Sequence, residues 1–321
     1  MYLFCISSFD ILSRDYMKIF VLKIVQVVFI ITVLLALFIL CPWLDGEPFH
    51  NIETKHLLLE KITGKKIILV GGSGVANGLS AGTIKKNMPG FSAVNMGLNA
   101  GLGLRFNINE IMGHIQAGDL IVLSPEYENF EGGQNGSVQI LKAVSIAPFT
   151  SKYVTSDQYR KLLRYDSLTF VQLKAQSYFD RVTSIFTHAS VKIDGYGDRI
   201  SESSTRDVSK IEFNLKVTPQ AYSECVAILN HFDTFCKERG AIVLLSYPSI
   251  PSVQFKTLEQ AINNLHKSLS KNTHILILHT PAEAVFGPEY FDDSVYHLSK
   301  AGRDIRSRKI AEMITSRVIT Q

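Results

Sequence analysis

The sequence predicts an α/β fold, a three-layer sandwich with a mostly parallel central sheet, preceded by one N-terminal transmembrane helix. Three observations predict it. Short, continuous apolar runs are typical of strands buried on both faces. These runs alternate with longer stretches of helical spacing, which favours a parallel sheet covered by helices on both sides. One further apolar run, near the start of the chain, is long enough to cross a bilayer.

The run from 24 to 41, IVQVVFIITVLLALFILC, is the predicted membrane anchor. Only Gln26 and Thr32 interrupt it with polar side chains, and as a helix it spans roughly 27 Å, close to the hydrocarbon thickness of a bilayer. A cleaved signal peptide is an alternative, but the run is long for such a peptide and no A-x-A-like site follows it. A buried core helix is the other alternative.

The charges that flank the anchor predict its orientation. Arg14, Lys18 and Lys23 precede the apolar run, whereas Asp45 and Glu47 follow it. The positive-inside rule then places the N-terminus in the cytoplasm and the body of the chain outside it. We therefore expect a single-pass protein of the inner (cytoplasmic) membrane, with an extracytoplasmic, or periplasmic, soluble domain.

The 321 residues are enough for one membrane segment and one α/β domain with a proper core. The expected segments are a cytoplasmic tail at 1–23, the anchor at 24–41, a connector at 42–64 and the α/β domain at 65–321. A short helix is expected in the connector, around 55–62. The true start of the chain is open between Met1 and Met17.

The α/β domain contains five apolar runs that we interpret as strands and five stretches that we interpret as helices. The expected strands lie at 67–70, 93–96, 120–124, 241–247 and 274–279. The expected helices lie at 81–87, 105–115, 219–238, 256–269 and 300–319. The stretch from about 131 to 217 breaks this rhythm, so we interpret it as an insertion over the top of the sheet that shapes substrate access. A partly ordered surface excursion is the alternative.

Composition excludes several other classes of protein. The formal net charge is +4, and the basic residues do not gather in one run beside aromatic residues, so nucleic-acid binding is not expected. No cofactor and no metal are expected either. Five histidines show no metal-ligand spacing to one another or to the cysteines: His188, His231, His266, His274 and His279.

A glycine-flanked serine follows the first predicted strand of the domain, in the stretch GGSGVANG at 71–78. In a parallel sheet, ligands bind outside the carboxyl ends of the strands. There, the Ser73 hydroxyl is exposed, and free backbone N–H groups near a helix start can stabilise an oxyanion. A glycine-rich turn that happens to contain serine is the alternative. A phosphate-binding loop is disfavoured, because neither GK[ST] nor G-x-G-x-x-G spacing occurs.

A second candidate feature, YFDDSVYHLSKAG at 290–302, lies between the last predicted strand and the last predicted helix. Asp293 lies four residues before His297, so its carboxylate can meet one side of the imidazole. The other ring nitrogen would then face a serine as a general base. A surface loop with a solvated histidine is the alternative.

Together the two features give the chain order of SGNH/GDSL hydrolases, and from about 65 to 318 the sequence resembles that superfamily. The stretches that carry the resemblance are VGGSGVANG, VNMGLNAG and DDSVYHLSKAG. The resemblance implies an SGNH, flavodoxin-like sandwich. Membrane-tethered bacterial relatives with such variation are often linked to modification of cell-envelope polysaccharide.

The resemblance also implies site roles. Ser73 takes the role of the nucleophile and His297 that of the general base, with Asp293 as the orienting acid and Asp292 as the second candidate. The backbone N–H groups of Ser73 and Gly97 would contribute to the oxyanion site. We add the nearby Asn99 side chain as a further donor.

Three positions depart from the family pattern. The acid usually lies three residues before the histidine, where this chain has Ser294, and Gly72 stands where the family often has aspartate. The third family block usually supplies an asparagine, but the corresponding stretch here is LIVLSPEYENF, with Glu126 and Tyr127. A carboxylate would not stabilise an oxyanion, so we expect Glu126 and Tyr127 to orient a substrate hydroxyl or a partner side chain.

The leading hypothesis is acyl transfer at Ser73, either to water (an esterase) or to a sugar hydroxyl (an O-acyltransferase). The expected partners are an acylated glycan or lipid substrate, the membrane through the N-terminal helix, and envelope biosynthesis proteins. A non-catalytic SGNH-like protein for envelope polysaccharide binding or assembly is the first alternative, favoured by the missing asparagine. A cytoplasmic nucleotide-binding domain is the second, and it requires the opposite topology.

Overall fold

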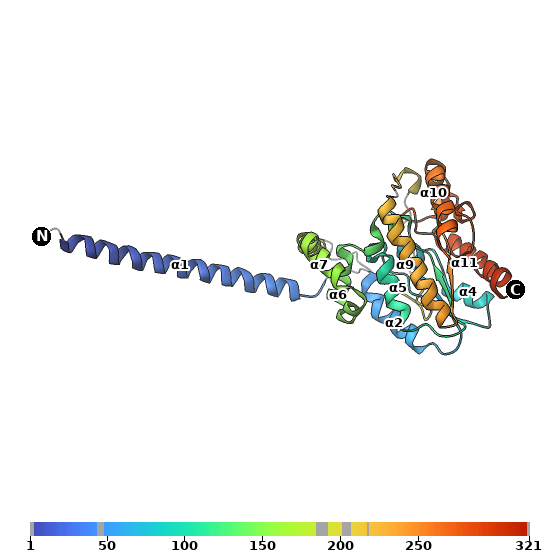
Figure 1. Cartoon of the computed structure of the whole chain (residues 1–321), viewed down its shortest axis with the longest axis horizontal. Helices are drawn as coiled ribbons and strands as arrows, with labels where there is room; N and C mark the ends of the chain where they lie inside the picture. The colour runs from blue at the N-terminus through green and yellow to red at the C-terminus, as the bar shows by residue number, and fades with distance from the viewer. Residues whose placement is uncertain (1–2, 44–47, 184–191, 201–206, 217, 320–321) are drawn as a thin grey trace. The chain divides into compact units, whose positions relative to one another are not determined.

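The computed structural model describes residues 3–43, 48–183, 192–200, 207–216 and 218–319. The chain divides into two compact units, Met1–Leu44 and Asp45–Gln321. The first unit is built on one long helix, α1 (Leu3–Leu40), drawn in blue in Figure 1. Its stretch Tyr16–Leu40 is long and apolar enough to span a membrane. The helix is longer than the expected anchor at 24–41, since residues 3–23 are also helical.

The second unit is an α/β domain around a five-stranded parallel sheet, which confirms the predicted fold class. The strand order is β2-β1-β3-β4-β6, and every neighbouring pair is parallel. The strands are β1 (Lys66–Val70), β2 (Ser92–Asn95), β3 (Leu120–Leu123), β4 (Ile242–Leu245) and β6 (Leu276–Ile277). All five fall on the apolar runs of the sequence. A second, two-stranded parallel pair was not expected; it joins β5 (Ile250–Pro251) and β7 (Val285–Phe286).

The sheet separates two apolar layers. On β1, Ile68 and Val70 belong to one buried cluster, whereas Ile67 and Leu69 belong to another. Because successive side chains of a strand point to opposite faces, a strand between two layers reads as one continuous apolar run. This explains why the period of two is missing from these segments.

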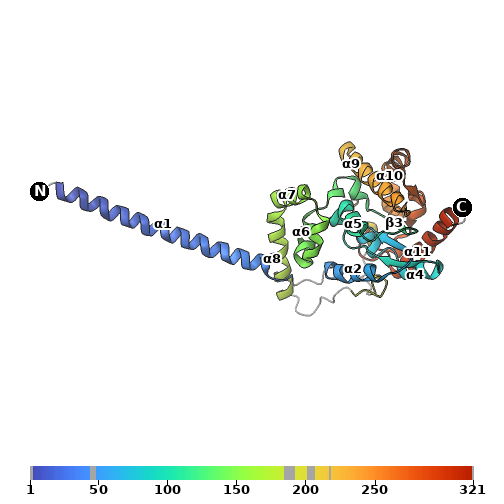
Figure 2. The same ribbon diagram turned by 60° about the horizontal axis from the view of Figure 1, so that its bottom comes forward.

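Helices cover both faces of the sheet (Figure 2). One cluster draws buried side chains from α5, α9 and α10, and the other from α4 and α11. The helices are α4 (Ala81–Asn87), α5 (Gly103–Met112), α9 (Pro219–Glu238), α10 (Ser252–Asn272) and α11 (Lys300–Ile314). A single turn of helix, α3 (Ser73–Ala76), follows β1 directly.

The stretch at 42–64, expected to be a connector, contributes to the core of the domain. It contains a 3-10 turn at Pro48–Asn51 and α2 (Ile52–Lys61), on which Ile52 and Leu59 are buried. The expected short helix is therefore present but begins earlier than 55, and its inner face packs against the body.

The insertion at about 131–217 is mostly helical where it is described. It contains α6 (Val138–Ile146), α7 (Ser156–Tyr165) and α8 (Ser167–Thr183), and α6 and α7 supply buried side chains to a third apolar cluster. The loop 192–200 then returns to the sheet, where the Asn95 N–H donates to the Tyr196 carbonyl at 2.8 Å. Most of the polar tract that follows, residues 201–206, lies outside the described residues.

Candidate active site

Ser73 lies where β1 ends, at the start of α3, on the carboxyl edge of the parallel sheet. The two glycines before it are required by close packing. A Cβ at Gly71 would come within 2.5 Å of the Ser124 carbonyl oxygen, and one at Gly72 within 2.5 Å of Ala100 Cα and of Glu126 Oε1. A side chain at position 72 would therefore require a shift of the Ala100 backbone and of Glu126.

The carboxylate of Glu126 holds the serine turn in place. Its Oε1 accepts the Gly74 N–H at 2.7 Å, and its Oε2 accepts the Gly72 N–H at 3.2 Å. The side chain is fully buried, and burial raises the pKa of Glu126, although the two backbone N–H groups oppose this rise. Glu126 and Gly72 therefore depend on each other. The Glu126 carboxylate, on the loop after β3, occupies the space that a side chain at position 72 would need.

This arrangement corrects the expected roles of Glu126 and Tyr127. Glu126 points at the backbone on either side of Ser73 rather than at a substrate. Tyr127 is 1% exposed and stacks on Tyr247, with ring centroids 6.5 Å apart, inside the core. Neither side chain reaches the cavity in which Ser73 lies, because both point inward from the end of β3.

Arg306 of α11 also stabilises the serine turn, through hydrogen bonds of its guanidinium group. Its guanidinium donates to the Gly74 carbonyl at 3.1 Å, to Ser124 Oγ at 2.8 Å and to the Tyr247 carbonyl at 3.0 Å. Burial lowers the pKa of Arg306 to about 10, opposed by the charge of Glu126. No sequence pattern pointed to this residue, because a lone arginine on a surface helix usually lies on the solvated face.

His297 and Asp293 form a hydrogen-bonded pair. Asp293 Oδ1 lies 2.7 Å from His297 Nδ1. This bond lowers the pKa of Asp293, so the carboxylate stays ionised and Nδ1 carries the proton. The loop is closed by the Asp292 N–H, which donates to the His297 carbonyl at 2.9 Å. The other ring nitrogen, Nε2, is then the acceptor atom of the imidazole.

Ser73 and His297 line the same cavity, of about 170 Å³, although they are more than two hundred residues apart in the sequence. Other lining residues are Lys55, Asn77, Gly97, Asn99 and Arg199. Within the described part of the chain, neither the Ser73 hydroxyl nor its backbone N–H has a hydrogen-bond partner in the domain. The convergence on which the sequence hypothesis depends is therefore present, with the serine oxygen free to engage a ligand.

The expected oxyanion donors behave differently from one another. The Gly97 N–H already donates to Asn95 Oδ1 at 2.9 Å, so it is not available to an oxyanion in this arrangement. Asn99 Oδ1 accepts the Gly101 N–H at 2.8 Å, which fixes the amide and leaves Nδ2 as its unengaged donor among the described contacts. Asn99 is thus better placed than Gly97 to stabilise negative charge.

Lys55, on α2, is a cavity residue that the sequence did not reveal. Its Nζ donates to the Asn95 carbonyl at 2.7 Å and to the Gly197 carbonyl at 2.8 Å, and the side chain is 3% exposed. Burial lowers the pKa of Lys55 to about 8, opposed by the charges of Asp198 and Glu110. Because α2 falls in a stretch expected to be a connector, no pattern pointed to it.

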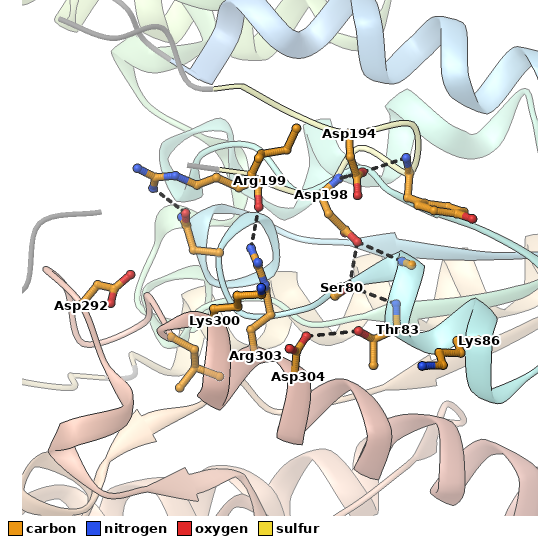
Figure 3. Close-up of a pocket in the computed structure, with 15 residues that line it drawn as sticks. Ser80, Thr83, Lys86, Asp194, Asp198, Arg199, Asp292, Lys300, Arg303 and Asp304 are labelled. Atoms are coloured by element: carbon orange, nitrogen blue, oxygen red, sulfur yellow. Dashed lines mark hydrogen bonds between the residues drawn. The ribbon is translucent and has the colours of Figure 1, made fainter. Parts of the chain in front are cut away.

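A larger cavity, of about 490 Å³, adjoins the first and shares Asn77 and Arg199 with it. Figure 3 shows groups from α11 facing Ser80 and Thr83 of the α4 segment, with the loop 192–200 closing the third side. Four of its lining residues are cationic and four are carboxylates: Lys86, Arg199, Lys300, Arg303, Asp194, Asp198, Asp292 and Asp304. Asp292, the second candidate acid, therefore belongs to this cavity rather than to His297.

No family model and no curated protein matches the chain. Among solved structures, the fold is similar to the crystal structure of the Bacillus subtilis protein YxiM, with a TM-score of 0.40 and 13% sequence identity. The similarity covers 80% of this chain and 58% of that chain, so the matched region is a little over half of the length of YxiM.

Proposed function

We propose that this chain is a membrane-anchored, serine-dependent acyl ester hydrolase or O-acyltransferase that acts on cell-envelope polysaccharide or lipid. The observation that carries the proposal is the meeting of Ser73 and His297 in one cavity, with Asp293 bonded to the far side of the imidazole at 2.7 Å. A nucleophile, a base and an acid that orients the base are the parts that acyl transfer requires.

In the first half of the reaction, His297 Nε2 takes the proton of Ser73 Oγ as this oxygen attacks the carbonyl carbon of the ester. The tetrahedral intermediate collapses, the bond to the leaving alkoxide breaks, and His297 returns the proton to that oxygen. In the second half, water or a sugar hydroxyl loses its proton to His297 and attacks the acyl-serine. Ser73 regains its proton, and the acyl group leaves as a carboxylic acid or as a new ester.

Three groups suit the negative charge that develops on the carbonyl oxygen. They are the unengaged backbone N–H of Ser73, the Nδ2 group of Asn99 and the buried ammonium of Lys55. Donors that are fixed before the reaction, in a site with little water, stabilise an oxyanion more than solvent does. The asparagine that is missing after β3 is replaced in this proposal by Asn99 and Lys55.

The membrane topology narrows the substrate class. The charges that flank the apolar span favour an N-terminus in the cytoplasm, which puts the α/β domain outside the inner membrane. Acylated envelope glycans and lipids are the esters found there, and envelope biosynthesis proteins are the expected partners. Reporter fusions at the C-terminus test the topology: an enzyme active only outside the cytoplasm is expected to work, and activity of a cytoplasmic reporter alone would contradict the proposal.

A non-catalytic role in binding or assembling envelope polysaccharide is the second candidate. Two observations favour it. The Gly97 N–H is engaged by Asn95, and the residue at the usual asparagine position, Glu126, is committed to the serine turn. A protein that keeps the fold but has lost part of its oxyanion site would bind a glycan without turning it over.

Fluorophosphonate labelling separates the two candidates. These probes form a covalent bond only with a serine whose hydroxyl is activated by a neighbouring base. We expect the detergent-solubilised full chain to be labelled and Ser73→Ala to be unlabelled. Thr83→Ala, which removes a hydroxyl from the larger cavity, is the matched control and keeps the label. An unlabelled wild-type protein would favour the binding role.

A further inference from the structure

Three side chains with metal-ligating atoms gather on α2 and just after α5, and none of them lines the Ser73 cavity. They are His56 and Glu60, one helical turn apart on α2, and His114, which follows α5. One ligand atom from each lies within 4.8 Å of the other two. Residues four apart share one face of a helix, so the spacing of His56 and Glu60 presents an imidazole and a carboxylate together.

The His56 ring has a close polar neighbour, the Glu110 carboxylate, which lies 3.3 Å from its Nε2. Neither histidine ring nor the Glu60 carboxylate has a hydrogen-bond partner among the described residues. His56 is 4% exposed, and its Nε2 is buried without a hydrogen bond. An orphaned ring nitrogen at such depth is uncommon, because burying a polar atom without a partner costs free energy.

A second orphan faces the first. Glu110 of α5 is 1% exposed, and its Oε1 lies 3.3 Å from His56 Nε2 without hydrogen-bond geometry. A carboxylate beside the non-ligating nitrogen of a histidine is a usual companion of protein metal sites, where it orients the imidazole and raises its basicity. With Glu110 beside Nε2, the ligating atom of His56 is Nδ1.

We propose that His56, Glu60 and His114 bind a divalent transition metal, with Zn²⁺ as the best fit. Two imidazoles and one carboxylate are a ligand set typical of zinc sites that keep an open position. Ligand atoms around one tetrahedral Zn²⁺ lie about 3.4 Å apart, and the three atoms here lie within 4.8 Å of one another, so no pair has to close by more than about 1.4 Å. The exposed Glu60 carboxylate and the half-buried His114 ring can do this by side-chain rotation.

The position suggests what the metal does. It joins α2 to the end of α5, and α2 carries Lys55, the residue before His56, to the cavity of Ser73. A metal at this point fixes the helix that follows the membrane anchor onto the α/β body. The site makes no use of Ser73, so it stands whether or not the chain is an acyl-transfer enzyme.

Zinc binding by the full chain, purified in detergent without a polyhistidine tag and stripped with chelator, tests the proposal. We expect one Zn²⁺ per chain in competition with a chromophoric chelator, and a higher melting temperature with Zn²⁺ than without. Mg²⁺ at the same concentration is expected to have no effect, because it prefers oxygen ligands.

His114→Ala and Glu60→Gln are each expected to weaken Zn²⁺ binding at least tenfold and to abolish the zinc-dependent rise in melting temperature. The matched controls are His231→Ala on α9 and Glu53→Gln on α2, both exposed and both expected to bind like the wild type. A wild-type chain without bound Zn²⁺ overturns the proposal. So do His114→Ala and Glu60→Gln variants that bind Zn²⁺ as tightly as the controls.

Discussion

The two adjoining cavities differ in size and in charge. The one that contains Ser73 is about 170 Å³, and its described lining holds the cations Lys55 and Arg199 but no carboxylate. The larger one is about 490 Å³ and balances four cations with four carboxylates. A small cavity with positive charge suits the carbonyl group on which negative charge develops. A large cavity with mixed polar groups suits a molecule rich in hydroxyls, such as a glycan.

The same division separates two adjacent carboxylates. Asp293 bonds the ring of His297 in the small cavity, whereas Asp292 lines the larger one. Spacing alone could not assign the acid, since either residue lies within a turn of the histidine. Replacing one aspartate at a time, Asp293 or Asp292, is therefore the sharpest way to test the difference.

The largest effect is expected for Asp293→Asn, with Asp292→Asn as its matched control. The asparagine amide no longer requires a proton on His297 Nδ1, as the Asp293 carboxylate does. The tautomer that carries its proton on Nε2 becomes accessible, and kcat/KM falls by about 10²–10⁴-fold. Asp292→Asn is expected to leave hydrolysis of a small nitrophenyl ester within about tenfold of the wild type. Equal losses in the two variants would erase the distinction between the cavities.

The next effect concerns the positive charge of the small cavity. Lys55→Met removes one of its two cations, leaving Arg199, and is expected to lower kcat/KM by about 10–100-fold at pH 7, somewhat less than the loss of an oxyanion-hole donor. Burial lowers the pKa of Lys55 to about 8, so the wild-type advantage should fade as the pH rises through 8. A rate ratio that does not change with pH would show that Lys55 acts through packing alone.

The pH dependence of stability tests the lowered pKa of Lys55 independently of activity. Its folded pKa is about 8 against an ordinary 10.5, so between these values the unfolded chain binds more protons. The contribution of Lys55 to stability therefore rises with pH across this window, by at most about 1.4 kcal/mol per pH unit. Melting temperatures at pH 8 and pH 10 should show the wild type gaining on Lys55→Met. The reverse order would contradict the lowered pKa of Lys55 in the folded protein.

The sequence predicts features that arise from neighbouring residues better than features that arise from residues far apart in the chain. The five strands of the main sheet followed from local runs of apolar residues, since burial on both faces leaves a signal within each segment. Ser73 and His297 followed from their places after the first strand and before the last helix. Lys55 and Arg306 did not, because each acts on carbonyl oxygens that are distant in sequence. Only the folded chain brings these partners together.

The exchange at Gly72 and Glu126 illustrates the same limit. Taken singly, Gly72 stands where the resemblance implies an aspartate, and Glu126 lies in the stretch where it implies an asparagine. In the structure the Glu126 carboxylate fills the space beside Gly72 and bonds its N–H. A departure at one site can therefore be compensated at another, and the sequence shows the two changes without showing that they meet.

Glu126→Gln tests this compensation, and it disturbs the turn between the two cavities rather than either lining. The amide keeps one acceptor but turns its NH₂ group toward a backbone N–H, so one buried donor loses its partner. We expect a loss of about 1–3 kcal/mol in stability, or several degrees in melting temperature. Glu131→Gln, on the same segment, is the control. An unchanged melting temperature in Glu126→Gln would mean that the carboxylate does not hold the turn.

The smallest effect is expected in the larger cavity, where Tyr196 is 36% exposed on the loop 192–200. An exposed ring beside hydroxyls and carboxylates can stack on a sugar face. Tyr196→Ala should raise the KM for an acetylated oligosaccharide by about three- to tenfold, the equivalent of roughly 1 kcal/mol of contact. Hydrolysis of a small nitrophenyl ester, which fills only the Ser73 cavity, should not change. If both substrates lose rate equally, the ring supports the loop that carries Arg199 to the shared wall, and the two cavities act as one site.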